Sequence, residues 1–340
     1  MRALTAAEHR AATVSPARLS RERHRGLELL RATEAAALAV GRWLGRGDKS
    51  STRDVGERAM EEALLGMPFD GHVIIDAGGV ADPLSPGRRI GVGRDQVDLA
   101  IDSVDGVSLV AKGLSQAISI AAAAEPGGIV KPPPCAYMHK LAVGPRARGA
   151  IDIADSPENN LRRIAFAMDV QVQDLTVMLL DRPRHQGIIE RVRSLGSRLV
   201  LITDGDIAAA LMTAWPGSGI DVFIGSGGTA EAVLAACALR CLGGEMQCRP
   251  WTRNQEESAA LRAAGFDPEA KLGIADLVPG TDVAVAVTGV TGGGLVRGVQ
   301  YHNWWAETHS LVMRAQSGTV RDIRTKHHVA LDPKDAHRLV

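Results

Sequence analysis

The chain has 340 residues, of which 45% are hydrophobic and 3% aromatic, with 39 basic and 39 acidic side chains. This length allows one large domain or two of moderate size with an ample core. A formal net charge of zero gives no sign of a nucleic-acid-binding or acidic-lipid surface. No stretch reaches the roughly 18 apolar residues of a membrane span. From the charge balance we expect no nucleic-acid partner, and from the missing apolar stretch we expect no membrane partner.

Residues 1–23 are rich in Ala, Arg, Ser and Thr, and we interpret them as a flexible N-terminal extension. Their Arg and Ser content would also suit a transit peptide, but Glu8 and Glu22 count against it. Apolar periodicity then predicts a helix over 24–44 and a second amphipathic helix after Gly45–Lys49.

The middle of the chain favours strands. A short buried strand is predicted at Val73–Ile75, followed by four segments punctuated by Gly and Pro: Val97–Ile101, Ser108–Ala111, Ile118–Ala123 and Leu141–Val143.

From Leu175 onwards, strands and helices alternate. The strands are predicted at 175–180, 199–202 and 222–224, and the helices at 188–195, 207–213 and 230–242. Three such units in series indicate a parallel sheet covered by helices. We expect strand 283–287 to join that sheet, and strands 311–314 and 319–323 to close the first region.

The four cysteines indicate structural thiols. Cys237 and Cys241 are four residues apart on a predicted helix, and a zinc site would need further ligands, of which Cys248 is the only near candidate. Buried free thiols are the favoured interpretation for these three and for Cys135. Without a signal peptide, a reducing cytoplasm is the expected location.

Two aspartates follow the apolar run that ends at Ile101, namely Asp102 and Asp105, before a turn at Gly106. Clustered carboxylates suit a hard divalent cation such as Mg²⁺ or Mn²⁺, and such a cation can clamp a phosphate. Taken alone, the pattern is more often a turn with solvated acids.

Three later strands also end in polar loops: Asp181-Arg182-Pro183-Arg184-His185, Asp204-Gly205-Asp206, and Gly225-Ser226-Gly227-Gly228 with Glu231 beyond it. Ligands of open α/β sheets bind outside the carboxyl ends of strands, so these loops should converge. The arginines match phosphate oxygens, and the glycine turn bares N–H groups at a helix N-terminus. Helix capping by the acids with solvated arginines is the alternative. The G-x-G-x-x-G spacing of dinucleotide-binding proteins is absent.

These segments together resemble the class II fructose-1,6-bisphosphatase family, some members of which also act on sedoheptulose 1,7-bisphosphate. The resemblance runs from about Leu27 to Val320 and rests on these motifs: Gly45-Arg46-Gly47-Asp48-Lys49, Asp102-x-x-Asp105-Gly106, Tyr137-Met138-x-Lys140, the three polar loops above, and Thr288-Gly289-Val290-Thr291.

The resemblance implies an α/β fold, the layered sugar-phosphatase sandwich shared with inositol monophosphatases. It would comprise an α+β region over 24–170, completed by closing strands at 305–330, and an α/β substrate-phosphate region over 171–304. It also implies a cytoplasmic enzyme of gluconeogenesis that assembles as a dimer or tetramer.

The resemblance further implies hydrolysis of the 1-phosphate of a sugar bisphosphate such as fructose 1,6-bisphosphate, with Mn²⁺ or Mg²⁺ as cofactor. Metal ligation would come from Asp48, Asp102, Asp105 and Glu231, the first three being the catalytic residues. Substrate contacts would come from Tyr137, Arg182, Arg184, Asp204, Asp206 and Gly228.

The chain departs from the family pattern on the metal side. Ala77 stands where a metal-binding Glu is usual, Val107 where a catalytic Thr is usual, and Asp105 where a Glu is usual; a Gly-Asp pair is replaced within Gly292–Gly294. Ser108 follows Val107 but, on a strand, would point to the opposite face. Asp76 could replace the missing Glu only in part. A divergent phosphatase acting on another phosphorylated sugar, or an impaired sugar-phosphate-binding homologue, therefore stays open.

Overall fold

The computed structural model describes residues 25–78 and 84–328. The flexible extension predicted for residues 1–23 lies outside them. The described residues form two mixed sheets with helices between and outside them, which confirms the predicted α/β class.

The first sheet has eight strands. They are β1 Asp70–Asp76, β2 Arg89–Ile90, β3 Gln96–Asp105, β4 Ile118–Ala124, β11 Ala284–Gly289, β12 Gln300–Tyr301, β13 Trp305–Arg314 and β14 Thr319–His328. Their order is β12-β13-β11-β4-β3-β1-β2, with β14 also paired to β13. The pair β1–β3 is parallel, and the other pairs are antiparallel.

The second sheet has six strands in the order β10-β9-β5-β8-β6-β7. They are β5 Tyr137–Val143, β6 Thr176–Leu180, β7 Arg198–Ile202, β8 Val222–Gly228, β9 Glu245–Trp251 and β10 Leu272–Gly273. The sheet is parallel only from β8 through β6 to β7. The βα alternation thus predicted the parallel half, whereas β5 and β9 are antiparallel additions.

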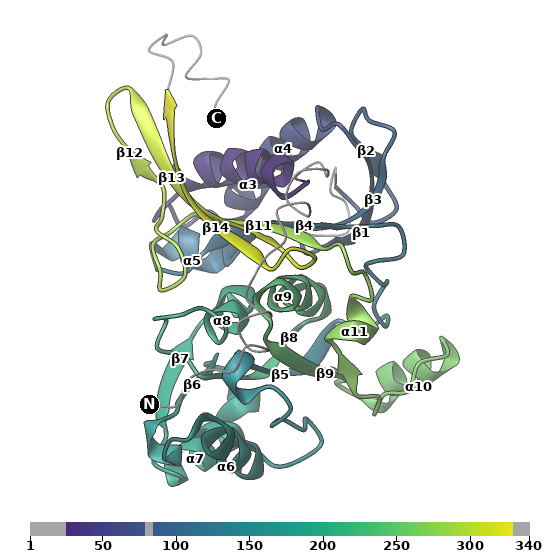
Figure 1. Cartoon of the computed structure of the whole chain (residues 1–340), viewed down its shortest axis with the longest axis vertical. Coiled ribbons are helices and arrows are strands. Elements are labelled where there is room, and N and C mark those ends of the chain that lie inside the picture. The colour runs from purple at the N-terminus through teal and green to yellow at the C-terminus, as the bar shows by residue number, and fades with distance from the viewer. Residues whose placement is uncertain (1–24, 79–83, 329–340) are drawn as a thin grey trace, which may run out of the picture.

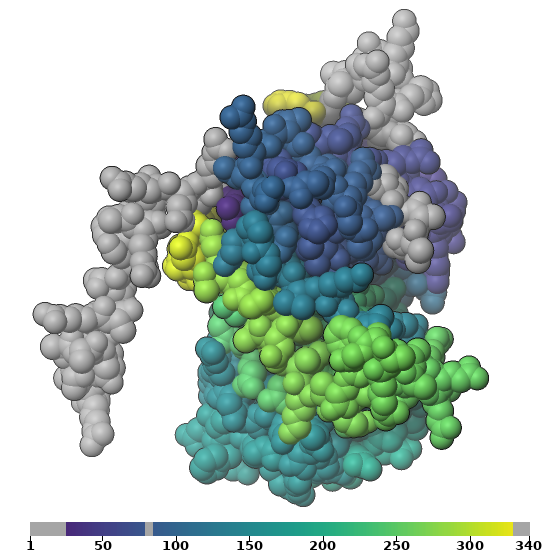
Figure 2. Space-filling view, turned by 90° about the vertical axis from the view of Figure 1, so that its right-hand side faces the viewer, coloured from purple at the N-terminus to yellow at the C-terminus, as the bar shows by residue number. Residues whose placement is uncertain are grey.

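The helices complete five layers (Figure 1). The α-helices of the described residues are α3 Arg25–Gly41, α4 Lys49–Leu65, α5 Val107–Lys112, α6 Pro157–Met168, α7 Gln186–Ser194, α8 Asp206–Met212, α9 Thr229–Leu242, α10 Gln255–Ala263 and α11 Ile274–Leu277. Helices α3 and α4 cover the outer face of the first sheet, α8 and α9 lie between the sheets, and α6 and α7 cover the second sheet. Figure 2 shows the green surface of α10 on the face towards the viewer, below the blue surface of the N-terminal part of the described chain.

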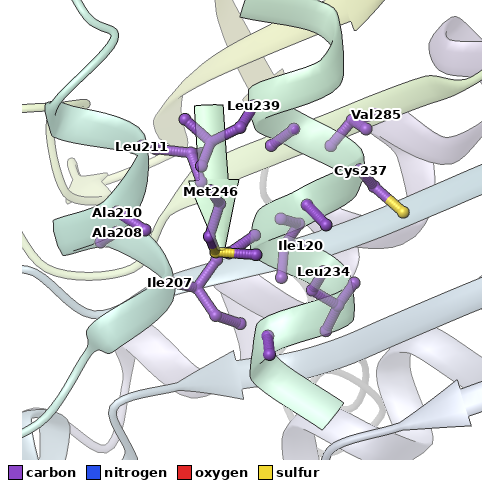
Figure 3. Close-up of a cluster of buried hydrophobic side chains, with 14 of the residues drawn as sticks. Ile120, Ile207, Ala208, Ala210, Leu211, Leu234, Cys237, Leu239, Met246 and Val285 are labelled. Atoms are coloured by element: carbon purple, nitrogen blue, oxygen red, sulfur yellow. The ribbon is translucent and has the colours of Figure 1, made fainter. Parts of the chain in front are cut away.

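The middle layer forms the main core. Helix α9 is buried at ten of its fourteen residues because it packs against a sheet on each side. Figure 3 shows Leu239 of this helix beside Leu211 of α8, with Leu234, Met246 of β9 and Val285 of β11 in the same buried cluster. All seven residues of β4 are buried, and its run of four alanines, Ala121–Ala124, lets α3 and α9 approach its two faces.

Three predicted elements were wrong in kind or in place. Residues 108–111 belong to helix α5, because Gly106 at φ 93° ends the strand and a short apolar run fits either structure. Strand β11, expected beside the parallel strands, pairs instead with β4 and β13 of the first sheet. Strand β5, expected in the first region, lies at the centre of the second sheet.

The prediction of buried thiols is confirmed for Cys237, Cys241 and Cys248, whereas Cys135 is half-buried; all four are free. Burial raises the pKa of Cys241 and of Cys248 to about 12, so both stay protonated. Strands β13 and β14 close the first sheet as predicted. Among the described helices, none has the length and apolarity needed to cross a membrane.

Candidate active site

An acidic cavity of about 390 Å³ lies where five separate segments of the chain converge. They are the ends of β1 and β3, the loop after β7, and the beginnings of α4 and α9, with the turn into α5 continuing from β3. The residues that line it are Lys49, Ser50, Arg53, Ala77, Gly78, Asp102, Ser103, Val104, Asp105, Gly106, Val107, Ser108, Asp204 and Glu231. Four predicted site residues, Asp102, Asp105, Asp204 and Glu231, are thus brought together.

An irregularity in β3 explains how Asp102 and Asp105 reach the same cavity. In a regular strand, residues three apart lie on opposite faces. The pairing of β3 with β4 shifts register between Asp102 and Asp105, as at a β-bulge, which re-aims side chains. Asp102 accepts a hydrogen bond from the Val104 N–H at 3.0 Å, which fixes its carboxylate inside this irregular segment.

The carboxylates of the cavity repel one another. Burial and the Glu231 charge raise the pKa of Asp102, and the nearby Arg53 charge opposes this rise. Burial raises the pKa of Asp105 as well, reinforced by Asp102 and by Asp206. The pKa of Glu231 is raised by burial and by Asp206, against the charge of Lys140. Such a cluster would be stabilised by a bound cation.

The donor set fits a hard divalent cation. Asp102, Asp105 and Glu231 offer carboxylate oxygens, which Mg²⁺ and Mn²⁺ prefer. Within residues 25–78 and 84–328, no three His, Cys, Asp or Glu side chains are already gathered at metal-binding distance. A Mg²⁺ ion usually takes one or two carboxylates and keeps several waters, so these residues suffice for one such ion.

Asp48 caps the N-terminus of helix α4 in this structure. It is the N-cap of α4 and accepts hydrogen bonds from the Ser51 N–H at 3.0 Å and the Ser51 hydroxyl at 2.6 Å. These bonds lower the pKa of Asp48. Its side chain is exposed, and it is its neighbours Lys49, Ser50 and Arg53 that line the cavity.

The glycines at the end of β8 let two carboxylates approach the backbone closely. A Cβ at Gly227 would come within 2.0 Å of Asp206 Oδ2, and one at Gly228 within 1.9 Å of Glu231 Oε2. Asp206 also forms a buried ion pair of 2.5 Å with Lys140 Nζ. Burial pushes the pKa of Lys140 down, but Asp206 and Glu231 outweigh it, so that this pKa is raised and the ammonium stays charged.

Arg184 is held firmly beside this turn. Its Nε donates to the Ser226 hydroxyl at 2.9 Å and its guanidinium to the Ser226 carbonyl at 2.7 Å. His185 supports Ser226: its Nδ1 lies 2.7 Å from the Leu180 carbonyl, and its Nε2 accepts from the Ser226 N–H at 2.9 Å. These bonds define a neutral Nδ1–H tautomer, consistent with a pKa lowered by burial.

Two aromatic side chains lie beside Arg184, one of them the predicted substrate residue Tyr137. Its guanidinium lies 5.7 Å from the ring centroid of Tyr137 and 5.4 Å from that of Trp251, which positions it by cation–π contact. Tyr137 pairs with Gly228 across β5 and β8. Arg182 is half-buried and donates to the Thr203 carbonyl at 2.6 Å.

Several residues of this region were missed or misjudged from the sequence. Ser108 lines the cavity, contrary to the expectation for a strand, because it lies in α5. Arg53 and Trp251 were not predicted from the sequence. The four-residue spacing of Lys49 and Arg53, which puts both on one face of α4, could have indicated Arg53. Lys140 was part of a motif, but its buried ion pair with Asp206, 66 residues later in the chain, could not be predicted from local sequence.

A larger cavity, of about 850 Å³, lies away from these residues. It is lined by Arg148, Asp152, Arg240, Glu245 and Lys271 among others. Lys271 and Asp152 already form an ion pair at 2.6 Å there. Its two carboxylates, Asp152 and Glu245, stand among three basic side chains, whereas the smaller cavity gathers four carboxylates, so the chemistry is assigned to the smaller one.

A layered α/β sandwich with a carboxylate-lined cavity beside an arginine and a glycine turn defines a class of protein, the metal-dependent phosphatases. A family model described as bacterial fructose-1,6-bisphosphatase, glpX-encoded, matches residues 23–327. Two relatives are each 37% identical and matched over 89% of this chain. One, over 95% of its own length, is D-fructose 1,6-bisphosphatase class 2/sedoheptulose 1,7-bisphosphatase of Synechococcus sp. (strain JA-2-3B'a(2-13)). The other, over 96%, is fructose-1,6-bisphosphatase class 2 of Haemophilus influenzae. The chain belongs to the class 2 fructose-1,6-bisphosphatase family, as the resemblance implied.

Proposed function

We propose that the protein hydrolyses the 1-phosphate ester of a sugar bisphosphate such as fructose 1,6-bisphosphate, with Mn²⁺ or Mg²⁺ as cofactor. The observation that carries the proposal is that Asp102, Asp105 and Glu231 line one cavity, while Arg184 is fixed at the adjoining end of β8. The relatives named above are bisphosphatases by name.

The carboxylates would hold the cation. A divalent ion bound there would offset the phosphate charge and favour ionisation of the attacking water. Asp102, Asp105 and Glu231 support this role because they line the same cavity. Asp48 would first have to release Ser51, to which both its carboxylate oxygens are bonded.

The residues of the second sheet would hold the rest of the substrate. Arg182 and Arg184 would take the remote phosphate, with Tyr137 and the backbone at Gly228 alongside, and Asp204 and Asp206 would accept hydrogen bonds from sugar hydroxyls. Fixing the remote end of the substrate orients the ester for in-line attack by water, which breaks the bond between phosphorus and the sugar oxygen.

A second candidate function is sugar-phosphate binding with little or no turnover. It is favoured by one observation: Ala77 and Val107, which offer neither a carboxylate nor a hydroxyl, both line the cavity. Loss of one preorganised polar contact costs about 10²–10³ in rate. A phosphatase for another phosphorylated sugar would share this altered cavity.

Phosphate release from fructose 1,6-bisphosphate and a panel of other sugar bisphosphates, with Mn²⁺ or Mg²⁺, tests the proposal. We expect release that is abolished by chelation and by Asp102→Ala. No release from any member of the panel, together with micromolar binding by calorimetry, would establish the binding function instead.

We also propose a cytoplasmic location and a homo-oligomeric state, dimer or tetramer, both of which rest on the family resemblance. Light scattering on the purified full chain tests the second: a monomer at micromolar concentration would contradict it.

A further inference from the structure

The beginning of α4 contributes two positively charged residues, Lys49 and Arg53, to the acidic cavity. Lys49, Ser50 and Arg53 line it, and they lie on one face because residues four apart on a helix are neighbours. Arg53 is half-buried, and its charge acts on Asp102, whose pKa it helps to lower against the effect of burial.

These cations are poorly placed for helix stability. The N-terminus of a helix carries partial positive charge, so acidic residues are favourable there and basic ones unfavourable. The first turn of α4 contains no acidic residue, although the N-cap Asp48 offsets part of the charge. Lys49 stands in this first turn, and Arg53 follows as the fifth residue of the helix, where the dipole effect has fallen off, so helix stability does not account for either cation.

The guanidinium of Arg53 is also available. Within the described part of the chain it makes no hydrogen bond and no ion pair within 4.0 Å of a carboxylate. Arg184, by contrast, already donates two hydrogen bonds to Ser226. A free planar fork of N–H donors, held near carboxylates but not bonded to them, leaves room for an anion between them.

We propose that Arg53 binds a phosphate group of the ligand in the acidic cavity, as a fixed positive charge on the α4 side. This inference rests on the proposed function, since it takes the cavity to be the place where a sugar phosphate is bound. The planar guanidinium would share the phosphate oxygens with whatever cation Asp102, Asp105 and Glu231 hold.

The proposal predicts effects of opposite sign on two ligands. Replacing Arg53 by Met removes a positive charge, so Mn²⁺ alone should bind several-fold more tightly, whereas inorganic phosphate in the presence of Mn²⁺ should bind at least about tenfold more weakly. The two affinities of the Arg53→Lys variant should lie between those of the wild type and those of Arg53→Met. Arg58→Met, an exposed position on the same helix, is the matched control and should leave both affinities within about twofold.

Isothermal titration calorimetry on the full chain measures both affinities, and circular dichroism verifies the fold of each variant. The titrations are repeated in an Arg184→Met background, so that a phosphate bound at the second sheet does not obscure the cavity. An unchanged phosphate affinity in Arg53→Met would overturn the proposal. So would an equal weakening of both ligands, because that is the result of a damaged fold.

The same experiment separates this inference from the proposed hydrolysis. If the wild-type protein releases no phosphate from any sugar bisphosphate but the two titrations shift in opposite directions, only the hydrolysis fails. If it hydrolyses the substrate and phosphate binding does not depend on Arg53, only the role of Arg53 fails.

Discussion

Single residues decide how much of the family's chemistry this cavity can perform. Asp102, Asp105 and Glu231 keep their carboxylates, and the irregular pairing of β3 brings the first two to one place. Two other positions on the same lining, Ala77 and Val107, are apolar. The cavity therefore retains acids that would attract a cation, and it offers neither a carboxylate at position 77 nor a hydroxyl at position 107.

Restoring those groups should raise activity. In the double variant Ala77→Glu with Val107→Thr, we expect kcat for fructose 1,6-bisphosphate to rise by about tenfold or more, since a preorganised polar contact contributes about 10²–10³ in rate. Steady-state phosphate release measures it. Ala77→Gln with Val107→Thr, which lacks the added charge, is the control. Equal rates in the double variant and the wild type would show that these positions do not limit turnover.

The side chain of His139 makes the stability of the fold depend on pH. Burial and the neighbouring Arg249 lower its pKa to about 4 from 6.5. The unfolded chain therefore takes up a proton near pH 6.5 while the folded protein resists it. Stability contributed by neutral His139 is present above pH 6.5 and is lost as the pH falls towards 4.

His139→Gln should accordingly flatten the acid side of the stability curve. The melting temperature, measured by calorimetry between pH 7.5 and 4, should fall less steeply for this variant than for the wild type, with the difference confined to the region below pH 6.5. The exposed His302→Gln variant provides the comparison. Parallel curves for wild type and His139→Gln would contradict the assignment.

At the scale of an element, the turn from β8 into α9 links the two halves of the site. Arg184 is bonded at Ser226, Asp206 approaches Gly227, and Glu231 approaches Gly228, all within three consecutive residues of one strand end. The small size of the two glycines, more than any unusual backbone angle, is what this arrangement needs, because Gly228 has an ordinary φ of −61°.

Gly228→Ala should therefore damage the site more than the fold. The new Cβ would meet Glu231 Oε2 at 1.9 Å, and the flexible Glu side chain can move away. We expect a melting temperature within a few degrees of wild type and a loss of Mn²⁺ affinity of about tenfold by calorimetric titration, the change that 1.4 kcal/mol produces. Gly187→Ala, where a Cβ would meet nothing within 4 Å, should change neither. Undiminished Mn²⁺ affinity in Gly228→Ala would argue against Glu231 as a ligand.

For the whole molecule, local patterns predicted the elements better than their partners. The βα alternation identified β6, β7 and β8 and the polar loops after them, because strand, helix and turn preferences are local. It could not show that β11 pairs with β4, some 160 residues earlier, or that β5 crosses into the second sheet, because such pairings depend on packing between distant segments. For the same reason Arg53 escaped notice: only the fold brings the beginning of α4 against Asp102.

The pairing of distant segments within each sheet also determines how the molecule should unfold. Helix α9 packs on strands of both sheets, and one core cluster contains Ile120 and Val285 of the first together with Met138 and Phe223 of the second. A division of the chain at residue 170 would separate β5 from β8 and β9, its partners on either side. Neither half therefore has a complete core of its own, and calorimetry should show one cooperative transition for the full chain.

Leu234→Ala in α9 tests this coupling. Truncating a buried Leu costs about 2–5 kcal/mol, and Leu234 is fully buried in the shared core. Fluorescence of Trp305, in the first sheet, and of Trp251, in the second, can be followed separately in single-tryptophan variants. Both should report the same lowered denaturation midpoint, because removal of contacts in the middle layer weakens the attachment of each sheet to α9. Separate midpoints for the two reporters would mean that the sheets unfold independently, and that α9 belongs energetically to only one of them.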